Sequence, residues 1–148
     1  MNIAFFLLPK SKVAHIYNDC TLRQGLEKMK YHGYSAIPVI TRDNKYAGTV
    51  SEGDFLWYLL SKTKELDCKK LISTEERLIG EIMKKNKNPS VGINSSVEDL
   101  VEHIVNRNFV PVVDDLDNFI GIVTRSEILR YYYSNTEECV GHSLMRSR

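Results

Sequence analysis

Gly48-Thr49-Val50-Ser51-Glu52-Gly53-Asp54 is the stretch that decides the fold, because it returns as Gly121-Ile122-Val123-Thr124-Arg125-Ser126-Glu127. The two copies are in constant register, with 73 residues from Gly48 to Gly121. In each copy an apolar run leads to a hydroxyl and, three residues later, to a carboxylate. The same offset places Pro38 on Pro111. The pattern predicts two copies of one unit, each with a polar pair at a strand-to-helix turn.

The order of elements also repeats. Apolar residues at helical spacing predict a helix that starts after Thr21 or Asp19 and ends at Gly33. Strands are predicted over 34–40 and 46–50, with a short one over 13–16, and a helix follows from about residue 51. The second half repeats this order with a helix that contains Val97, Val101 and Ile104, strands over 109–113 and 119–123, and a helix over 126–133.

Each half therefore reads strand, helix, strand, strand, helix, which predicts an α/β fold of two βαββα repeats. Neither repeat is large enough to bury its apolar face well alone, so we expect them to pack with pseudo-twofold symmetry. This packing would bring the two strand-to-helix turns to a shared cleft. The predicted boundaries are 7–60 and 82–133 for the repeats, 61–81 for a connection with a partly helical middle, and 134–148 for a tail.

Composition narrows the classes of function. Apolar residues make up 43% of the 148, which is typical of a packed globular protein. The 20 basic and 19 acidic residues nearly cancel, which argues against a nucleic-acid partner. An apolar run of about 18 residues, which a membrane span would need, does not occur. Three widely spaced cysteines favour a reducing cytoplasm. Neither metal-ligand spacings nor enzyme motifs occur, so the sequence predicts a protein that is not an enzyme.

The repeated pattern resembles the CBS domain, and the whole chain looks like a tandem pair, a Bateman module. The first half is similar, more narrowly, to stand-alone bacterial CBS-pair proteins that bind cyclic di-AMP. Leu8-Pro9-Lys10-Ser11-Lys12-Val13-Ala14-His15-Ile16 and Gly33-Tyr34-Ser35-Ala36-Ile37-Pro38-Val39 carry this similarity. In the second half, Thr124-Arg125 matches the arginine that this group keeps after the threonine.

The resemblance implies a set of binding residues for an adenosine-containing ligand. Ser51 and Asp54 would contact ribose or phosphate in one site, and Thr124 and Glu127 in the other. Ile37 and Val110 would lie beside the adenine base of the ligand, and the Arg125 guanidinium is suited to a phosphate. Aromatic stacking on the purine would come from Tyr34 or Phe109. The implied set is completed by Ala14 and Ala36.

Structural alternatives stand beside these roles. Asp54 could simply cap the helix that follows it. Arg125 could be a solvated charge on an exposed turn, and Tyr34 and Phe109 could be core residues. Glu127 replaces the usual Asp and moves its carboxylate by about one carbon–carbon bond.

We therefore expect a cytoplasmic regulatory module that needs no cofactor, binds no metal and signals to an unidentified effector protein. Cyclic di-AMP is the favoured ligand and AMP, ADP or ATP the next. The alternative is a ligand-free module for interaction or dimerisation. The family resemblance implies a homodimer through the helices that follow the two turns, over 54–60 and 126–133. Neither nucleic acid nor membrane is expected as a partner.

Overall fold

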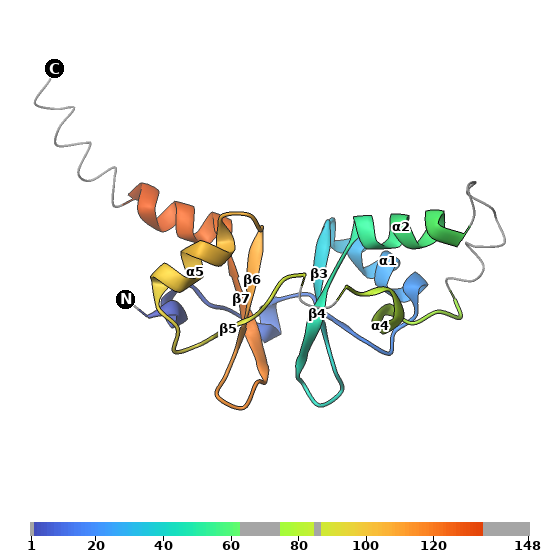
Figure 1. Ribbon diagram of the computed structural model, residues 1–148. Coiled ribbons are helices and arrows are strands. Elements are labelled where there is room, and N and C mark those ends of the chain that lie inside the picture. The colour runs from blue at the N-terminus through green and yellow to red at the C-terminus, as the bar shows by residue number, and fades with distance from the viewer. Residues whose placement is uncertain (1, 63–74, 85–86, 135–148) are drawn as a thin grey trace, which may run out of the picture.

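The computed structural model describes residues 2–62, 75–84 and 87–134. It shows two repeats side by side, each with a small sheet flanked by helices (Figure 1). Part of the connection, including its expected helical middle, and the tail beyond residue 134 lie outside the described residues. The elements, in chain order, are η1 (Ile3–Phe6), β1 (Leu8–Pro9), η2 (Lys10–Lys12), β2 (Ile16–Tyr17), α1 (Leu22–His32), β3 (Ala36–Ile40), β4 (Tyr46–Ser51), α2 (Glu52–Lys62), α4 (Ile79–Ile82), β5 (Val91–Gly92), α5 (Val97–Ile104), β6 (Phe109–Val113), β7 (Phe119–Thr124) and a final helix over 125–134.

The first repeat is built on the sheet β2-β3-β4, in which β2 is parallel to β3 and β3 is antiparallel to β4. Thr21 starts α1 with a capping box, because its hydroxyl accepts from the Gln24 amide while the Gln24 side chain accepts from the Thr21 amide. Gly33 ends α1 in the left-handed conformation, with φ 69°, that glycine adopts without strain. Both ends of this helix agree with the sequence prediction.

The second repeat has the same order, with β5 parallel to β6 and β6 antiparallel to β7. Ser96 caps α5 through its hydroxyl, which accepts from the Asp99 amide. In both repeats the hairpin after the middle strand turns through a residue with positive φ, Asn44 in one and Asp117 in the other. The predicted α/β fold of two βαββα repeats is therefore confirmed.

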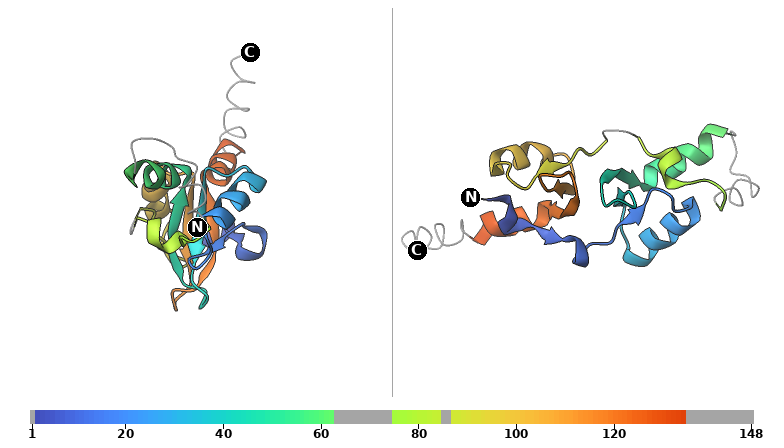
Figure 2. Two further views of the ribbon diagram at one scale, coloured as in Figure 1. Left: turned by 90° about the vertical axis from the view of Figure 1, so that its right-hand side faces the viewer. Right: turned by 90° about the horizontal axis from the view of Figure 1, so that it is seen from below.

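The segments that lead into the two repeats are exchanged in space. β1 pairs antiparallel with β7, so the N-terminal segment adds a strand to the sheet of the second repeat. Ile3 and Phe6 are buried in the core of that repeat, and Figure 2 shows η1 beside the helix over 125–134. In the same way α4, just before the second repeat, packs its buried Ile79 in the core of the first. The exchange joins the two halves in addition to the contact between their sheets.

The two sheets meet face to face along a third apolar cluster that both repeats supply. Val13 and Ile40 from the first repeat pack there with Phe109, Phe119 and Ile122 from the second. Backbone hydrogen bonds reinforce the contact, since the Phe119 amide donates to the Asn44 carbonyl at 2.8 Å. The predicted pseudo-twofold packing of sheet against sheet is thus observed.

The predicted strand over 13–16 is mostly wrong. β2 contains only Ile16 and Tyr17, which pair with Val39 and Ile40. Lys10–Lys12 form a short 3-10 turn, and Val13, which follows it, is buried in the cluster between the sheets. A residue that fills an interface from a turn needs no strand partner, although its apolar character resembles that of a strand residue.

Candidate functional site

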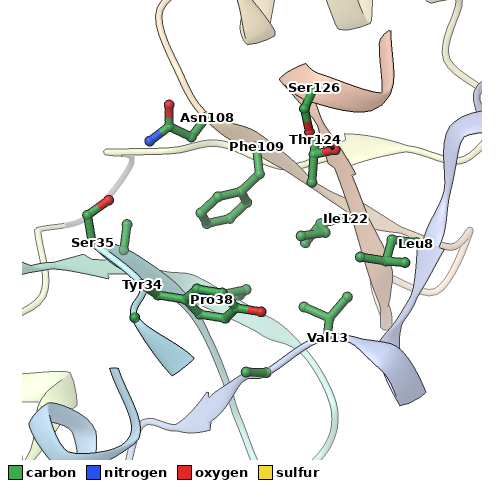
Figure 3. A pocket seen from close by; sticks show the side chains of 13 residues that line it. Leu8, Val13, Tyr34, Ser35, Pro38, Asn108, Phe109, Ile122, Thr124 and Ser126 are labelled. Carbon is green, nitrogen blue, oxygen red and sulfur yellow. Dashed lines mark hydrogen bonds between the residues drawn. The ribbon is translucent and has the colours of Figure 1, made fainter. Parts of the chain in front are cut away.

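Two clefts that contain predicted binding residues lie where the repeats meet, and each draws residues from both. The first cleft, of about 310 Å³, lies between the end of α1 and the end of β7 (Figure 3). Its lining residues are Leu8, Val13, Ala14, Gly33, Tyr34, Ser35, Ala36, Pro38, Asn108, Phe109, Ile122, Thr124 and Ser126. This volume falls at the lower end of the range for small-molecule sites.

The first cleft combines aromatic rings with hydroxyl groups. Tyr34 of the first repeat and Phe109 of the second approach the cavity from opposite sides (Figure 3). Tyr34 is 40% exposed and Phe109 is 9% exposed, so one ring is partly open and the other is nearly buried. At the end of β7 the hydroxyls of Thr124 and Ser126 lie 3.2 Å apart. The cleft can therefore hold a flat aromatic group with a polar attachment.

The second cleft, of about 570 Å³, is related to the first by the pseudo-twofold symmetry but has different chemistry. Arg107 stands in it where Tyr34 stands in the first cleft, and Asn88 stands where Val13 does. The lining of the second cleft consequently includes two basic side chains, Lys87 and Arg107, whereas the lining of the first cleft includes none. Its lining residues are Ser35, Ala36, Thr49, Ser51, Glu52, Gly53, Lys87, Asn88, Asn106, Arg107, Asn108 and Phe109.

The acidic corner of the first repeat, Ser51 with Asp54, is engaged by a lysine of the same chain. Asp54 is 4% exposed, and its Oδ2 accepts from the Ser51 amide at 2.8 Å. The Lys87 ammonium donates to both carboxylate oxygens at 3.0 Å and also to the Ser51 hydroxyl. The lysine compensates a carboxylate that would be costly to bury alone. A ribose diol that bonds Asp54 would compete with Lys87 for this carboxylate.

The corresponding corner of the second repeat is more open. Thr124 Oγ1 accepts from the Glu127 amide at 3.2 Å, as a cap would. The Glu127 carboxylate pairs with Arg130 at 2.9 Å. The Arg125 guanidinium donates to Asn108 Oδ1 at 2.9 Å, on the surface. The Thr124 hydroxyl therefore lies in the first cleft without an acidic residue beside it in the lining.

The structure separates the predicted binding residues into three groups, and it combines them across the repeats. The first cleft contains Thr124 of one repeat with Ala14, Tyr34 and Ala36 of the other, and with Phe109. The second contains Ser51, together with Ala36 and Phe109 again. The remaining predicted residues line neither cleft, and two of them, Ile37 and Val110, are fully buried strand residues; the group is Ile37, Asp54, Val110, Arg125 and Glu127. The binding roles of all eleven stay predictions.

Sequence reasoning missed the residues of the second cleft that come from the connecting loops. Lys87 and Asn88 precede β5, and Asn106, Arg107 and Asn108 join α5 to β6. A signal was present, since 75 residues separate Val13 from Asn88, the same offset that relates Leu22 to Val97. The exchange of an apolar Val13 for a polar Asn88 at equivalent positions of the two repeats indicates that the second repeat uses hydrogen bonds at this position.

A buried chain of hydrogen bonds supports the second cleft. Tyr46 donates to the Asn88 carbonyl at 2.6 Å and lies 2.7 Å from the Thr49 hydroxyl. Burial raises the pKa of Tyr46 to about 12, so the phenol stays protonated and able to donate.

Among the described residues, no group of three or more His, Cys, Asp or Glu side chains could hold a metal ion. The described helices are all too short or too polar to cross a membrane.

Comparison with known proteins identifies one family over both repeats of the chain. The model of the CBS domain matches twice, over residues 7–61 and 79–134. The cyclic di-AMP receptor B of Bacillus subtilis is 27% identical over 127 residues, which cover 84% of this chain and 82% of the receptor.

Solved structures agree with this match. A hypothetical conserved protein from Geobacillus kaustophilus is 31% identical, with a TM-score of 0.83 over 91% of this chain and 98% of its own. The CbpB protein of Listeria monocytogenes, in complex with c-di-AMP, is 26% identical, with a TM-score of 0.81 over 91% of this chain and 97% of its own. The similarity therefore extends over nearly the whole length of these proteins.

Proposed function

The chain belongs to the CBS domain family as a tandem pair, and from this premise we propose that it is a regulatory module that binds an adenine nucleotide in the first cleft. The observation that carries the proposal is the meeting of Tyr34 and Phe109, from different repeats, beside the hydroxyls of Thr124 and Ser126. An adenine can stack on the aromatic rings, and its ribose and phosphate can accept and donate hydrogen bonds at the hydroxyl end.

Cyclic di-AMP is the ligand we favour. The relatives named above include a cyclic di-AMP receptor and a c-di-AMP complex, and both are similar to this chain over most of its length. The first cleft offers hydroxyl and amide groups at its rim, and the Arg125 guanidinium is bonded to one of these, the Asn108 amide. A cationic fork at this rim suits a phosphodiester. AMP, ADP and ATP share the same adenosine portion and are the second candidates.

The ligand would act by holding the two repeats in one arrangement. Tyr34 and Thr124 belong to different sheets, so a ligand that contacts both favours the arrangement in which they are close, in proportion to its differential affinity. The readout lies on a partner in the cytoplasm, through an effector protein or a second copy of the chain. Leu56 and Trp57 of α2 and Leu129 of the last helix are exposed apolar side chains, which suits a homodimer through these helices.

A second candidate function is a ligand-free interaction module. The observation in its favour is the engagement of Ser51 and Asp54 by Lys87, which leaves that acidic corner satisfied without a ligand. This observation concerns the second cleft only. We therefore rank nucleotide binding in the first cleft ahead of it.

Thermal unfolding with a nucleotide panel tests the proposal, because a ligand of the native state must raise the melting temperature. We expect cyclic di-AMP to give the larger shift and AMP a smaller one. Tyr34→Ala should weaken the binding of cyclic di-AMP by about 0.5–1.5 kcal/mol, which is the range for aromatic pairs. Tyr31→Ala is the matched control, since Tyr31 is exposed and lines neither cleft. If neither nucleotide raises the melting temperature of the wild-type protein, the ligand-free interaction module is the better interpretation.

A further inference from the structure

Asn108 lies at the rim of the first cleft and bonds the residue that follows the Thr124 hydroxyl. Its main-chain carbonyl accepts from the Arg125 amide at 2.9 Å, and its side-chain Oδ1 accepts from the Arg125 guanidinium, also at 2.9 Å. Figure 3 shows Asn108 at the same edge of the cavity as Thr124 and Ser126. Arg125 is thus tied by its amide and by its guanidinium to one residue of the cleft lining.

The equivalent corner of the first repeat has the same backbone contact and different side chains. Ser35 and Asn108 stand at equivalent positions, 73 residues apart, and so do Glu52 and Arg125. The Glu52 amide donates to the Ser35 carbonyl at 2.9 Å, which matches the bond between the Arg125 amide and Asn108. The backbone contact is therefore common to both repeats, whereas the bond to the guanidinium depends on the side chains of Asn108 and Arg125.

An amide can hold a guanidinium without cancelling its charge. The Asn108 side chain is neutral, and a guanidinium has five N–H donors, so Arg125 keeps its charge and further donors for a ligand. Among the ion pairs of the described residues, none includes Arg125. The carboxylate of Glu127, two residues further on, pairs with Arg130 at 2.9 Å. Arg125 therefore carries an oriented and uncompensated positive charge beside the first cleft.

We propose that Asn108 is a positioning residue that holds Arg125 ready for a phosphate, so that the first cleft selects phosphate-bearing adenosine ligands over adenosine itself. The inference rests on the proposed function and deepens it, because it assigns this selectivity to a residue that acts through Arg125. A free arginine side chain loses conformational entropy when it binds an anion. The bond to Asn108 meets part of this cost before the ligand arrives.

Calorimetric titrations with cyclic di-AMP and with adenosine test the proposal. We expect Asn108→Ala to weaken the binding of cyclic di-AMP about fivefold and Arg125→Ala about tenfold. In the Arg125→Ala background, Asn108→Ala should add no further loss, because a positioning residue acts only through the group that it positions. Neither substitution should change the affinity for adenosine. Asn94→Ala is the matched control, since this exposed amide bonds Asp115 and lines neither cleft.

Asn108→Asp separates the orientation of Arg125 from its charge. The carboxylate keeps an acceptor for the guanidinium but cancels its charge, so cyclic di-AMP should bind more weakly than to Asn108→Ala, and the difference should shrink at high ionic strength. Additive losses in the double variant, an equal loss for adenosine, or unchanged binding of cyclic di-AMP by Asn108→Ala would each overturn the proposal. If the wild-type protein does not bind cyclic di-AMP at all, the proposed function fails as well, so the two failures are distinguishable.

Discussion

Substitution of Gly121 by alanine tests whether the exchange of the N-terminal segment holds the fold together. Gly121 lies in β7 directly opposite Pro9 of β1. A Cβ at this position would come within 2.2 Å of the Leu8 carbonyl oxygen, which belongs to the backbone and cannot rotate away. Gly48 is the equivalent glycine of the first repeat, where a Cβ would meet only the flexible side chain of Met83, at 3.2 Å.

The two glycines have nearly the same conformation, so their comparison isolates the clash. Their φ angles are 157° and 151°, a region that alanine adopts only with strain. The strain costs about 1–3 kcal/mol at either position. At Gly121 the contact with β1 adds about 1–3 kcal/mol of overpacking, or the loss of the β1–β7 pairing if β1 moves away. We therefore expect Gly121→Ala to destabilise by about 1–3 kcal/mol more than Gly48→Ala.

Urea unfolding followed by circular dichroism measures the two free energies of unfolding. A second readout is limited proteolysis near the N-terminus, which should accelerate for Gly121→Ala and not for Gly48→Ala if β1 is displaced. Equal destabilisation by the two substitutions would refute the reasoning, because it would mean that the close approach of β1 to β7 carries no energetic weight.

Three further predictions follow from buried groups. Burial raises the pKa of Tyr46 from an ordinary value of 10 to about 12, so the contribution of this group to the free energy of unfolding should be fully present below pH 10 and should be lost as the pH rises towards 12. Tyr46→Phe should flatten this part of the pH profile of the urea midpoint. A double-mutant cycle of Asp54→Asn and Lys87→Met should give a coupling of about 1–3 kcal/mol in unfolding free energy, whereas additive effects would contradict a tight pair. Ile3→Ala and Ile79→Ala should each cost about 2–5 kcal/mol in urea unfolding, since both side chains are fully buried in the opposite repeat; a small effect at Ile3 would show that the N-terminal segment is dispensable.

The sequence predicted the features that local chemistry determines. The helix from Leu22 to His32 follows from apolar spacing, a capping Thr21 and a terminal Gly33, each of which acts within a few residues. The paired strands on either side of each hairpin follow from apolar runs and turn residues in the same way. Duplication then made the second half a check on the first. These signals sufficed for the fold class and for the meeting of the two repeats.

The exchange of lead-in segments and the second cleft could not be predicted, because both depend on contacts between distant parts of the chain. Nothing local in Asn2–Leu8 tells that Ile3 packs in the second repeat and not in the first. Lys87 lies in the loop before β5, where the sequence shows no apolar periodicity, and its role comes from Asp54, 33 residues earlier. The family resemblance placed Ile37 and Val110 beside the adenine base; their side chains are buried in the cores, and their binding roles stay predictions.

The exchanged segment also explains how a ligand in the first cleft could affect the arrangement of both repeats. Leu8 lines this cleft and is paired in β1 with Ile122 of β7, so one wall of the cleft is a single hydrogen-bonded unit. The opposite wall, with Tyr34 and Ala36, leads directly into β3 of the other sheet. A ligand that touches both walls acts on the contact between two sheets that packing already holds. Because packed interfaces switch between discrete arrangements more readily than they deform, small differences in ligand contact at this cleft can select one arrangement of the two repeats.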